Sequence, residues 1–340
     1  MPVRSCYKVF KPGSLNRLKL IEEEFPAPSA AQATVAVKAI GLNFADIFAV
    51  MGLYSATPKG AFIPGLEFSG EVVAVGAGVS RLRPGDAVFG VSRFGAYTTH
   101  LNLDEKYLLP LPEGFTHEDA AAFPVQALTA YYALRPLGNL QRGQTVLIHS
   151  AAGGVGLLAN RIAKKWDAYT VGVVGSSKKF GVLEQEGYNA WLSRSKQFSA
   201  DLKKVLGDRP LHLVLEATGG KYFQWSYNAL SPMGRLVTYG SARFTPSGKA
   251  PNWPRLAWQY LTRPKIDPMK MTTDNKSVMG FNLIWLYEQH ELFHQLMQEI
   301  LALQLQPPHI GNHFSFQELP QALSLFQSGK TVGKVVVRVV

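Results

Sequence analysis

The stretch from Thr145 to Gly156 constrains the fold of this chain more than any other, and it reads Thr-Val-Leu-Ile-His-Ser-Ala-Ala-Gly-Gly-Val-Gly. Its apolar run Val146–Ile148 is typical of a buried parallel strand, and the following Leu157–Trp166 is typical of a helix with one apolar face. Strand, glycine-rich turn and helix open a dinucleotide-binding unit, because glycines let the backbone approach a pyrophosphate and the helix N-terminus offers amide donors to it. Ala151 stands where the G-x-G-x-x-G pattern has its first glycine, so a tight turn without a ligand stays open as an alternative.

Predicted strands and helices alternate along the chain from Gln144, which favours an α/β fold with a parallel, doubly wound sheet. About the first 110 residues instead hold many short runs separated by turns, a pattern typical of a barrel-like β domain. The expected strands of the parallel sheet are Thr145–Ser150, Tyr169–Val174, Leu211–Glu216 and Gly234–Tyr239, with Val278–Leu283 as a further candidate. Helices are expected at Gly41–Tyr54, twice within Thr116–Leu137, at Tyr287–Leu305 and at Glu318–Ser328, and a strand Lys334–Val340 is expected to return to the first domain.

The segment Ser241–Asn275 combines prolines, aromatic residues and cations. Such a composition can mark a segment that lies on a membrane surface or closes over a ligand. A loop that packs on its own domain is the interpretation we favour, and the other two stay open.

Composition and charge limit the classes of function. The chain has 340 residues, a net charge of +11 and a single cysteine, Cys6, so neither an internal disulfide nor a zinc site with several cysteines can form. No apolar run approaches the length of a membrane span, and Met1–Phe10 lacks the apolar core of a signal peptide, so a cytoplasmic protein is expected. The positive charge favours anionic partners such as a phosphorylated cofactor or an anionic membrane, whereas the absence of a dense Lys/Arg tract argues against nucleic acid.

The end of the second predicted strand indicates which dinucleotide would bind. NAD-binding units carry an acid there for the ribose 2′-hydroxyl, but this chain has Gly175-Ser176-Ser177-Lys178-Lys179. Two hydroxyls and two cations suit a 2′-phosphate, and Arg194 could add a further cation, so NADP(H) is predicted. A solvated start of a helix is the alternative interpretation of the same residues.

Two other chemistries are weakly supported. His290-Glu291-Leu292-Phe293-His294 matches the H-E-x-x-H pattern of zinc proteases, but no third ligand is evident and the helix has an ordinary amphipathic pattern. His149 and Ser150 are adjacent at a strand end, where neighbouring side chains usually point to opposite faces, and no G-x-S-x-G elbow is present. A metalloprotease and a serine hydrolase are therefore not expected.

Taken together, these stretches resemble the medium-chain dehydrogenase/reductase superfamily. The resemblance is to its zinc-independent quinone oxidoreductase (zeta-crystallin-like) branch, and within it most to the vesicle amine transport protein homologues. It rests on the order and spacing of matching stretches at Gly41–Asp46, Gly52–Tyr54, Pro64–Gly70, Gly138–Gln141, Ala151–Gly156, Pro232–Gly240, Gly280–Phe281 and Val332–Val335.

The resemblance implies a GroES-like β-barrel catalytic domain over residues 1–126 and 285–340, a Rossmann NADP(H)-binding domain over residues 127–284, and NADPH between them. It implies that Asn43, Tyr54 and Thr129 lie near the nicotinamide and its ribose, and that Gly240, Ser241 and Phe281 line the nicotinamide side. The pyrophosphate would be held by Gly153, Gly154, Val155 and Gly156, and the 2′-phosphate by Lys178 and Arg194. Lys334 or Lys330 would lie near the far end of the cleft.

The resemblance also sets the chain apart from its relatives. Zinc-dependent relatives carry a cysteine in the Gly41–Asp46 segment and a His-Glu pair in the Pro64–Gly70 segment, where this chain has Asn43 and Leu66-Glu67. No metal is therefore expected. Quinone reductases often have a tyrosine where this chain has Arg194, and Ser241–Asn275 is longer than in plain quinone reductases.

The resulting hypothesis is hydride transfer from NADPH to a quinone or an activated C=C acceptor such as an enone. Tyr54 or Asn43 would donate hydrogen bonds to the oxygen on which charge develops. The alternative is an NADPH-binding sensor, or an adaptor that contacts membranes through residues 241–275 and catalyses little. A homodimer that pairs through Val278–Leu283 is implied by the resemblance.

Overall fold

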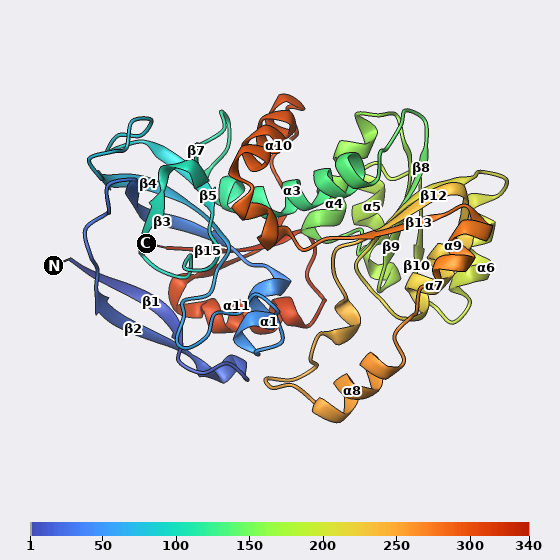
Figure 1. Ribbon diagram of the computed structural model, residues 1–340, viewed down its shortest axis with the longest axis horizontal. Coiled ribbons are helices and arrows are strands. Elements are labelled where there is room, and N and C mark those ends of the chain that lie inside the picture. Colours follow the sequence, from blue (N-terminus) through green and yellow to red (C-terminus); the bar gives the residue numbers. More distant parts are fainter. Residues whose placement is uncertain (1, 340) are drawn as a thin grey trace.

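The computed structural model describes residues 2–339 and shows two lobes side by side, one built on a largely antiparallel sheet and the other on a parallel sheet (Figure 1). The first lobe contains both ends of the chain, because its last strands come from the C-terminal segment. The predicted fold class, a GroES-like barrel domain with a doubly wound Rossmann domain, is confirmed. The exact domain boundaries, at 126/127 and 284/285, remain a prediction.

Seven strands form the sheet of the barrel lobe, in the order β14-β15-β3-β4-β5-β7, with β6 paired to β3. A separate hairpin, β1 with β2, lies beside it, and α1 and α11 pack together below (Figure 1). The elements are β1 (Val3–Val9), β2 (Leu18–Glu24), β3 (Gln32–Gly41), α1 (Phe44–Val50), β4 (Glu67–Val75), β5 (Ala87–Val91), β6 (His100–Asp104), β7 (Leu108–Pro110), α2 (His117–Ala121), β14 (Ile310–Ser315), α11 (Leu319–Gln327) and β15 (Lys334–Arg338).

The second lobe has six parallel strands in the order β10-β9-β8-β11-β12-β13. Its central strand β8 is buried along its whole length, as expected of a strand covered by helices on both faces. The elements are β8 (Thr145–His149), α4 (Gly154–Lys164), β9 (Tyr169–Val174), α5 (Phe180–Gln185), β10 (Ala190–Ser193), α6 (Phe198–Leu206), β11 (Leu211–Glu216), α7 (Lys221–Ala229), β12 (Leu230–Thr238), α8 (Trp253–Leu261), α9 (Pro268–Asp274) and β13 (Ser277–Gly280).

Helices α3 (Pro124–Tyr132) and α10 (His290–Ala302) contact each other, and α3 also packs on α4. Figure 1 shows them in the region where the two lobes meet. The short helical turns are Leu15–Arg17, Glu105–Tyr107, Ala133–Leu137, Ser177–Lys179, Ala242–Phe244, Leu283–Glu288 and Phe316–Glu318. One apolar core runs from α3 and α10 under the parallel sheet, so the lobes share buried side chains.

The structure corrects several local expectations. Ser241–Asn275 is not merely a loop, because it contains α8 and α9. Both helices have a proline in their first turn, where a missing N–H costs nothing, and each begins at a side-chain cap, Asn252 for α8 and Asp267 for α9. Two of the five prolines in this segment, Pro254 and Pro268, therefore lie at helix starts.

Other differences are shifts of element ends. The helix within Gly41–Tyr54 is confined to α1, and the predicted strand Val278–Leu283 ends at Gly280 before a 3-10 turn. The short strand β10 was not predicted. Residue 340, the end of the predicted strand Lys334–Val340, lies outside the described residues.

Candidate active site

The glycine turn joins β8 to α4, and it is held against the C-terminal segment. Gly153 is the N-cap of α4 and forms a bridge with Gly333, whose N–H donates to the Ala152 carbonyl at 2.8 Å. A Cβ on Gly156 would lie 2.6 Å from the Ala151 Cα, so this position accepts only glycine. Because no side chain caps α4, its first N–H groups are left for a ligand.

Cations lie at the ends of the neighbouring strands. After β9, Lys178 is exposed, whereas the Lys179 ammonium donates to the carbonyls of Gly329 and Thr331, at 2.9 and 2.6 Å, and ties this turn to the other lobe. After β10, Arg194 passes over Gly175, where a Cβ would lie 2.5 Å from Nη2. The Arg194 guanidinium forms no hydrogen bond with any of residues 2–339. Burial lowers its pKa. The Arg194 guanidinium therefore forms no ion pair within the described residues, although the Glu216 carboxyl acts on its pKa from a distance.

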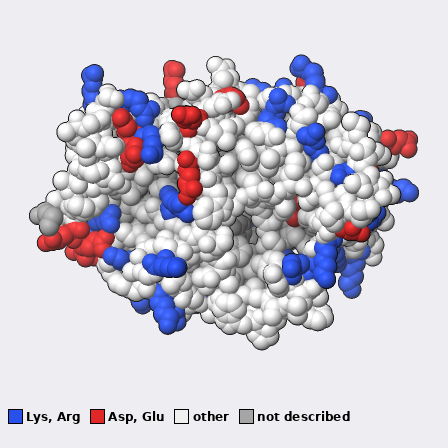
Figure 2. Space-filling model, in the orientation of Figure 1, with Lys and Arg blue, Asp and Glu red and all other residues white. Residues whose placement is uncertain are grey.

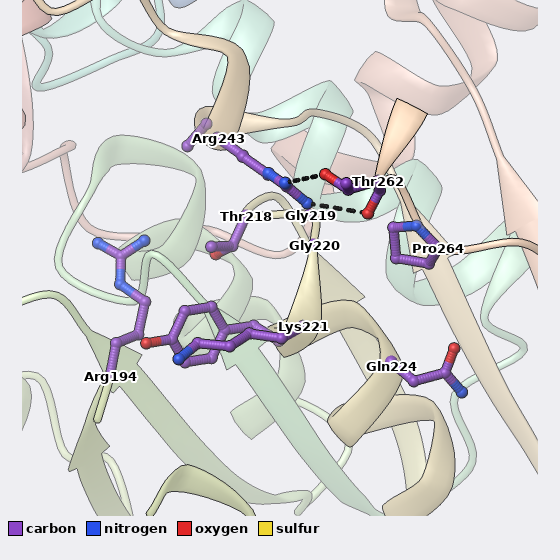
Figure 3. A pocket seen from close by; sticks show the side chains of 11 residues that line it. Arg194, Thr218, Gly219, Gly220, Lys221, Gln224, Arg243, Thr262 and Pro264 are labelled. Atoms are coloured by element: carbon purple, nitrogen blue, oxygen red, sulfur yellow. Dashed lines mark hydrogen bonds between the residues drawn. The ribbon is translucent and has the colours of Figure 1, made fainter. Parts of the chain in front are cut away.

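A pocket of about 690 Å³ opens beside Arg194 (Figure 3). Its floor is the β11–α7 turn at Gly219 and Gly220, and its opposite wall comes from the Ser241–Asn275 segment. Figure 3 shows Arg243 hydrogen-bonded to Thr262, with Nη2 donating to Oγ1 at 2.6 Å. This bond joins the turn Ala242–Phe244 to the end of α8 at the pocket.

A second, smaller pocket of about 190 Å³ adjoins the first and includes the predicted residues Gly240 and Ser241. Glu216, at the end of β11, lines it and is fully buried. Its Oε1 accepts from the backbone N–H groups of Thr218 and Gly219, at 2.7 and 2.8 Å. Burial raises the pKa of Glu216 to about 7, against the opposing effect of these two bonds.

A buried polar cluster connects the start of α1 to the C-terminal strand. The Lys334 ammonium, 2% exposed, donates to the Leu42 carbonyl at 2.6 Å and to Asn43 Oδ1 at 3.1 Å, and it pairs with the fully buried Glu67. Burial lowers the pKa of Lys334 while Glu67 opposes that shift. Three oxygens surround the ammonium, as a buried charge requires.

The same cluster uses all the hydrogen-bonding groups of the Asn43 amide. Its Nδ2 donates to Glu67 Oε1 at 2.9 Å and to the Gly41 carbonyl at 3.3 Å. Its Oδ1 accepts from Gln126 Nε2 at 2.7 Å as well as from Lys334. Asn43 is 6% exposed, so the catalytic role predicted for it stays a prediction that has to work from within this network.

Tyr54 comes from the barrel lobe and meets a residue that sequence reasoning did not select. Its hydroxyl donates to Asn282 Oδ1 at 2.7 Å. Asn282 follows Phe281, whose ring packs on Tyr132 and Tyr239 with centroids 5.0 and 6.2 Å apart. The structure thus brings Tyr54 and the Phe281 segment together. The Thr129 hydroxyl donates to the carbonyl of Val125 within α3, at 2.6 Å.

The H-E-x-x-H motif lies at the start of α10. His294 Nε2 contacts the Lys106 carbonyl at 2.5 Å, which joins α10 to the barrel lobe. No group of three or more His, Cys, Asp or Glu side chains within residues 2–339 could hold a metal ion. No helix in that range combines the length and apolar character needed to cross a bilayer.

Comparisons with known proteins agree with this geometry. The family described as "Alcohol dehydrogenase GroES-like domain" matches residues 29–113, and "Zinc-binding dehydrogenase" matches residues 154–302. The human synaptic vesicle membrane protein VAT-1 homolog is 35% identical over 313 residues, which cover 91% of this chain and 79% of the relative. The chain belongs to the medium-chain dehydrogenase/reductase superfamily.

Solved structures of this superfamily share the fold over almost the whole chain. The Escherichia coli quinone oxidoreductase complexed with NADPH has a TM-score of 0.85 and 25% identity and covers 98% of this chain and 99% of its own. The CurK enoyl reductase has a TM-score of 0.84 and 27% identity, with 99% of each chain covered. The branch predicted from the sequence is confirmed by the VAT-1 homologue and quinone oxidoreductase matches.

The zinc in the description of the matching family does not suit the residues of this medium-chain dehydrogenase/reductase. At the two segments where zinc-dependent relatives carry their ligands, Asn43 and Glu67 both bind the Lys334 ammonium. Thiolates and imidazoles are missing from this cluster, and a positive charge already lies at its centre. We therefore derive no step that involves zinc.

Proposed function

We propose that the chain is an NADPH-dependent oxidoreductase that reduces a quinone or an activated C=C bond such as that of an enone. The observation that supports this most is the Arg194 guanidinium, which lines the pocket and forms no ion pair within residues 2–339; the exposed Lys178 and the uncapped N-terminus of α4 agree with it. No carboxylate follows β9 to favour a ribose hydroxyl. The E. coli quinone oxidoreductase, similar in fold, was solved with NADPH.

When bound, NADPH would supply a hydride, which with one proton from solvent converts a quinone to a hydroquinone or an enone to a saturated ketone. The residues of this chain would do the rest. The Gly153–Gly156 turn and the α4 amides would hold the pyrophosphate, and Lys178 with Arg194 would hold the 2′-phosphate. Gly240, Ser241, Phe281 and Thr129 keep their predicted places around the nicotinamide end as part of this proposal, and Lys334 or Lys330 keeps its predicted place near the far end of the cleft.

Nucleotide titration tests the cofactor assignment. We expect NADPH to bind more tightly than NADH, and Arg194→Gln to weaken NADPH binding by about tenfold or more while leaving NADH almost unchanged, because a charged hydrogen bond to phosphate is lost. Arg142→Gln is the control, since Arg142 pairs with Asp167 on the exposed surface. Equal binding of the two nucleotides by the wild type would refute the assignment. NADPH oxidation with a panel of quinones and enones then tests catalysis.

A second candidate function, an NADPH sensor or adaptor at membranes, is favoured by α8. Trp253, Trp258 and Leu261 are 64%, 66% and 70% exposed, and Ser241–Ile266 contains five cations and no acid. Figure 2 shows uncharged surface over α8 with Lys and Arg side chains beside it. Such a helix suits an interface between water and anionic lipid.

Co-sedimentation with vesicles tests that candidate. We expect binding to phosphatidylserine-containing vesicles and not to pure phosphatidylcholine, and loss of binding when Trp253 and Trp258 become serine. Equal recovery of the wild type and this variant would exclude membrane contact through α8.

We also propose a cytoplasmic homodimer that pairs through β13, the last strand of its sheet. Sedimentation equilibrium that gives a monomer would refute the dimer.

A further inference from the structure

Asn282 occupies the N-cap position of the short helix Leu283–Glu288 but does not cap it. An asparagine there normally accepts a hydrogen bond from a backbone N–H of the first turn. Instead, its Oδ1 accepts from the Tyr54 hydroxyl at 2.7 Å. The side chain is therefore held away from its own helix and toward the barrel lobe.

The two residues of this pair are held by opposite lobes. Tyr54 follows α1, and its ring meets the Phe94 ring edge-on with centroids 6.4 Å apart. Asn282 follows β13, and the N–H of Phe281 donates to the Thr238 carbonyl at 3.2 Å. Because both backbones are anchored, the Tyr54 hydroxyl fixes the Asn282 amide in one orientation.

A count of donors shows which group is left for a ligand. The single proton of the Tyr54 hydroxyl is used by Asn282, and both N–H groups of Asn43 are used by Glu67 and Gly41. The Thr129 hydroxyl donates within α3. Within residues 2–339 nothing accepts from Asn282 Nδ2, and this atom is not sealed from solvent. Of these four polar side chains, Asn282 alone keeps unused donors.

We propose that Asn282 Nδ2 donates to the oxygen of the acceptor on which negative charge develops, and that Tyr54 is the residue that positions it. The inference rests on the proposed reductase function. When a hydride adds to the β-carbon of an enone, a C–H bond forms and the π electrons move to the carbonyl oxygen, and a hydride taken up by a quinone oxygen likewise leaves the negative charge on the opposite oxygen. A fixed neutral N–H stabilises that oxyanion until a proton from solvent completes the reduction.

The state of Tyr54 suits a positioning role. Burial raises the pKa of its hydroxyl to about 12, so the hydroxyl keeps its proton and its bond to Asn282 at every pH of ordinary assays. Asn43, which the sequence suggested as a donor, would then act through the Lys334 cluster rather than on the acceptor.

Binding of para-nitrophenol tests the donor without any turnover, because its phenolate mimics the oxyanion and its absorption reports ionisation. For the wild type we expect the phenolate to bind more tightly than the phenol, so that the pKa of the bound probe is lowered. Asn282→Asp keeps an oxygen for the Tyr54 hydroxyl but removes the N–H donors and adds a negative charge. In this variant we expect the preference for phenolate to disappear.

Kinetics supply the second readout. We expect Asn282→Asp and Asn282→Leu to lower kcat for quinone reduction by about 10²-fold with NADPH affinity unchanged, the usual effect of removing one oxyanion donor. Asn228→Asp, which adds the same charge on the exposed end of α7, is the matched control and should match the wild type. Circular dichroism checks that each variant is folded.

The outcomes separate the two proposals. If no acceptor oxidises NADPH with the wild type, the proposed function fails, and the phenolate experiment still decides whether Asn282 is a donor. If the wild type turns over but Asn282→Asp and Asn282→Leu retain its kcat and its preference for phenolate, the donor role is overturned. A wild type that binds phenol and phenolate equally overturns it as well.

Discussion

Replacing Lys334 by methionine should destabilise the protein more than any exposed lysine substitution. The change removes the ammonium but keeps the length of the side chain, so Glu67, with 0% exposure, loses its charge partner and the Leu42 carbonyl and Asn43 Oδ1 lose a donor. Removing one partner of a buried ion pair typically costs 3–5 kcal/mol, because the other charge stays uncompensated. We expect a loss of about 4 kcal/mol in the free energy of unfolding.

The double variant Glu67→Gln with Lys334→Met distinguishes this cause from lost packing. It removes both charges and keeps one amide oxygen, which can accept from Asn43 Nδ2 or from the Val125 N–H, the donor to Glu67 Oε2 at 2.9 Å in the wild type. We expect it to be at least about 2 kcal/mol more stable than Lys334→Met alone, since replacing a whole buried pair is far less costly than breaking it.

Urea unfolding at pH 7, followed by tryptophan fluorescence and circular dichroism at one fixed protein concentration, measures these differences. Lys330→Met is the control, because Lys330 is exposed on the same C-terminal segment, and it should change stability by less than about 0.5 kcal/mol. The reasoning is refuted if Lys334→Met lies within about 1 kcal/mol of the wild type, or if the double variant is no more stable than the single one.

Three further outcomes follow from burial and backbone geometry. Gly156→Ala should destabilise α4 severely, because its Cβ would meet backbone atoms of Ala151 at 2.6 Å, whereas Gly181→Ala meets nothing within 4 Å and should be neutral or stabilising; thermal unfolding compares them. The pKa of Glu216 is raised from its ordinary value to about 7, so the folded state holds a proton that the unfolded state releases, and this contribution to stability falls as pH rises from about 4.5 to 7, by up to about 3 kcal/mol. Urea unfolding at pH 5 and pH 8 should show Glu216→Gln to be relatively more stable at pH 8, and an unchanged difference would contradict the shift. Cys6 is fully buried and its thiol pKa is raised to about 11, so iodoacetamide should label it only after unfolding, as mass spectrometry would show.

Local patterns were sufficient to predict most strands of the parallel sheet. Tyr169–Val174 and Leu211–Glu216 have the bounds predicted from the sequence, because strands covered on both faces must be apolar and end where polar residues begin. The glycine turn could also be predicted from neighbouring residues alone. By contrast, α8 was missed because Pro254 reads as a breaker until one sees that Asn252 caps the helix just before it.

The polar cluster could not be derived in this way. Lys334 and Glu67 lie 267 positions apart, and nothing near either residue in the sequence signals that the two charges meet. Lys334 was assigned to the cofactor by resemblance alone, and a contact with the cofactor stays a prediction. The structure instead shows its ammonium surrounded by protein oxygens. Experiments should therefore first test whether the charge of Lys334 holds Asn43 in place.

The same limit explains why Asn43 was chosen as a donor and Asn282 was not. A sequence shows that an amide exists, but not whether its N–H groups are already used. The amide of Asn43 is already used within the protein: its Nδ2 faces Glu67, which accepts, and its Oδ1 faces the Lys334 ammonium, which can only donate. Gln126 must then donate to Asn43 Oδ1, as it does at 2.7 Å. Because both N–H groups of Asn43 are bound internally, the donor that we propose for the acceptor comes from across the lobes, where the hydroxyl of Tyr54 holds Asn282.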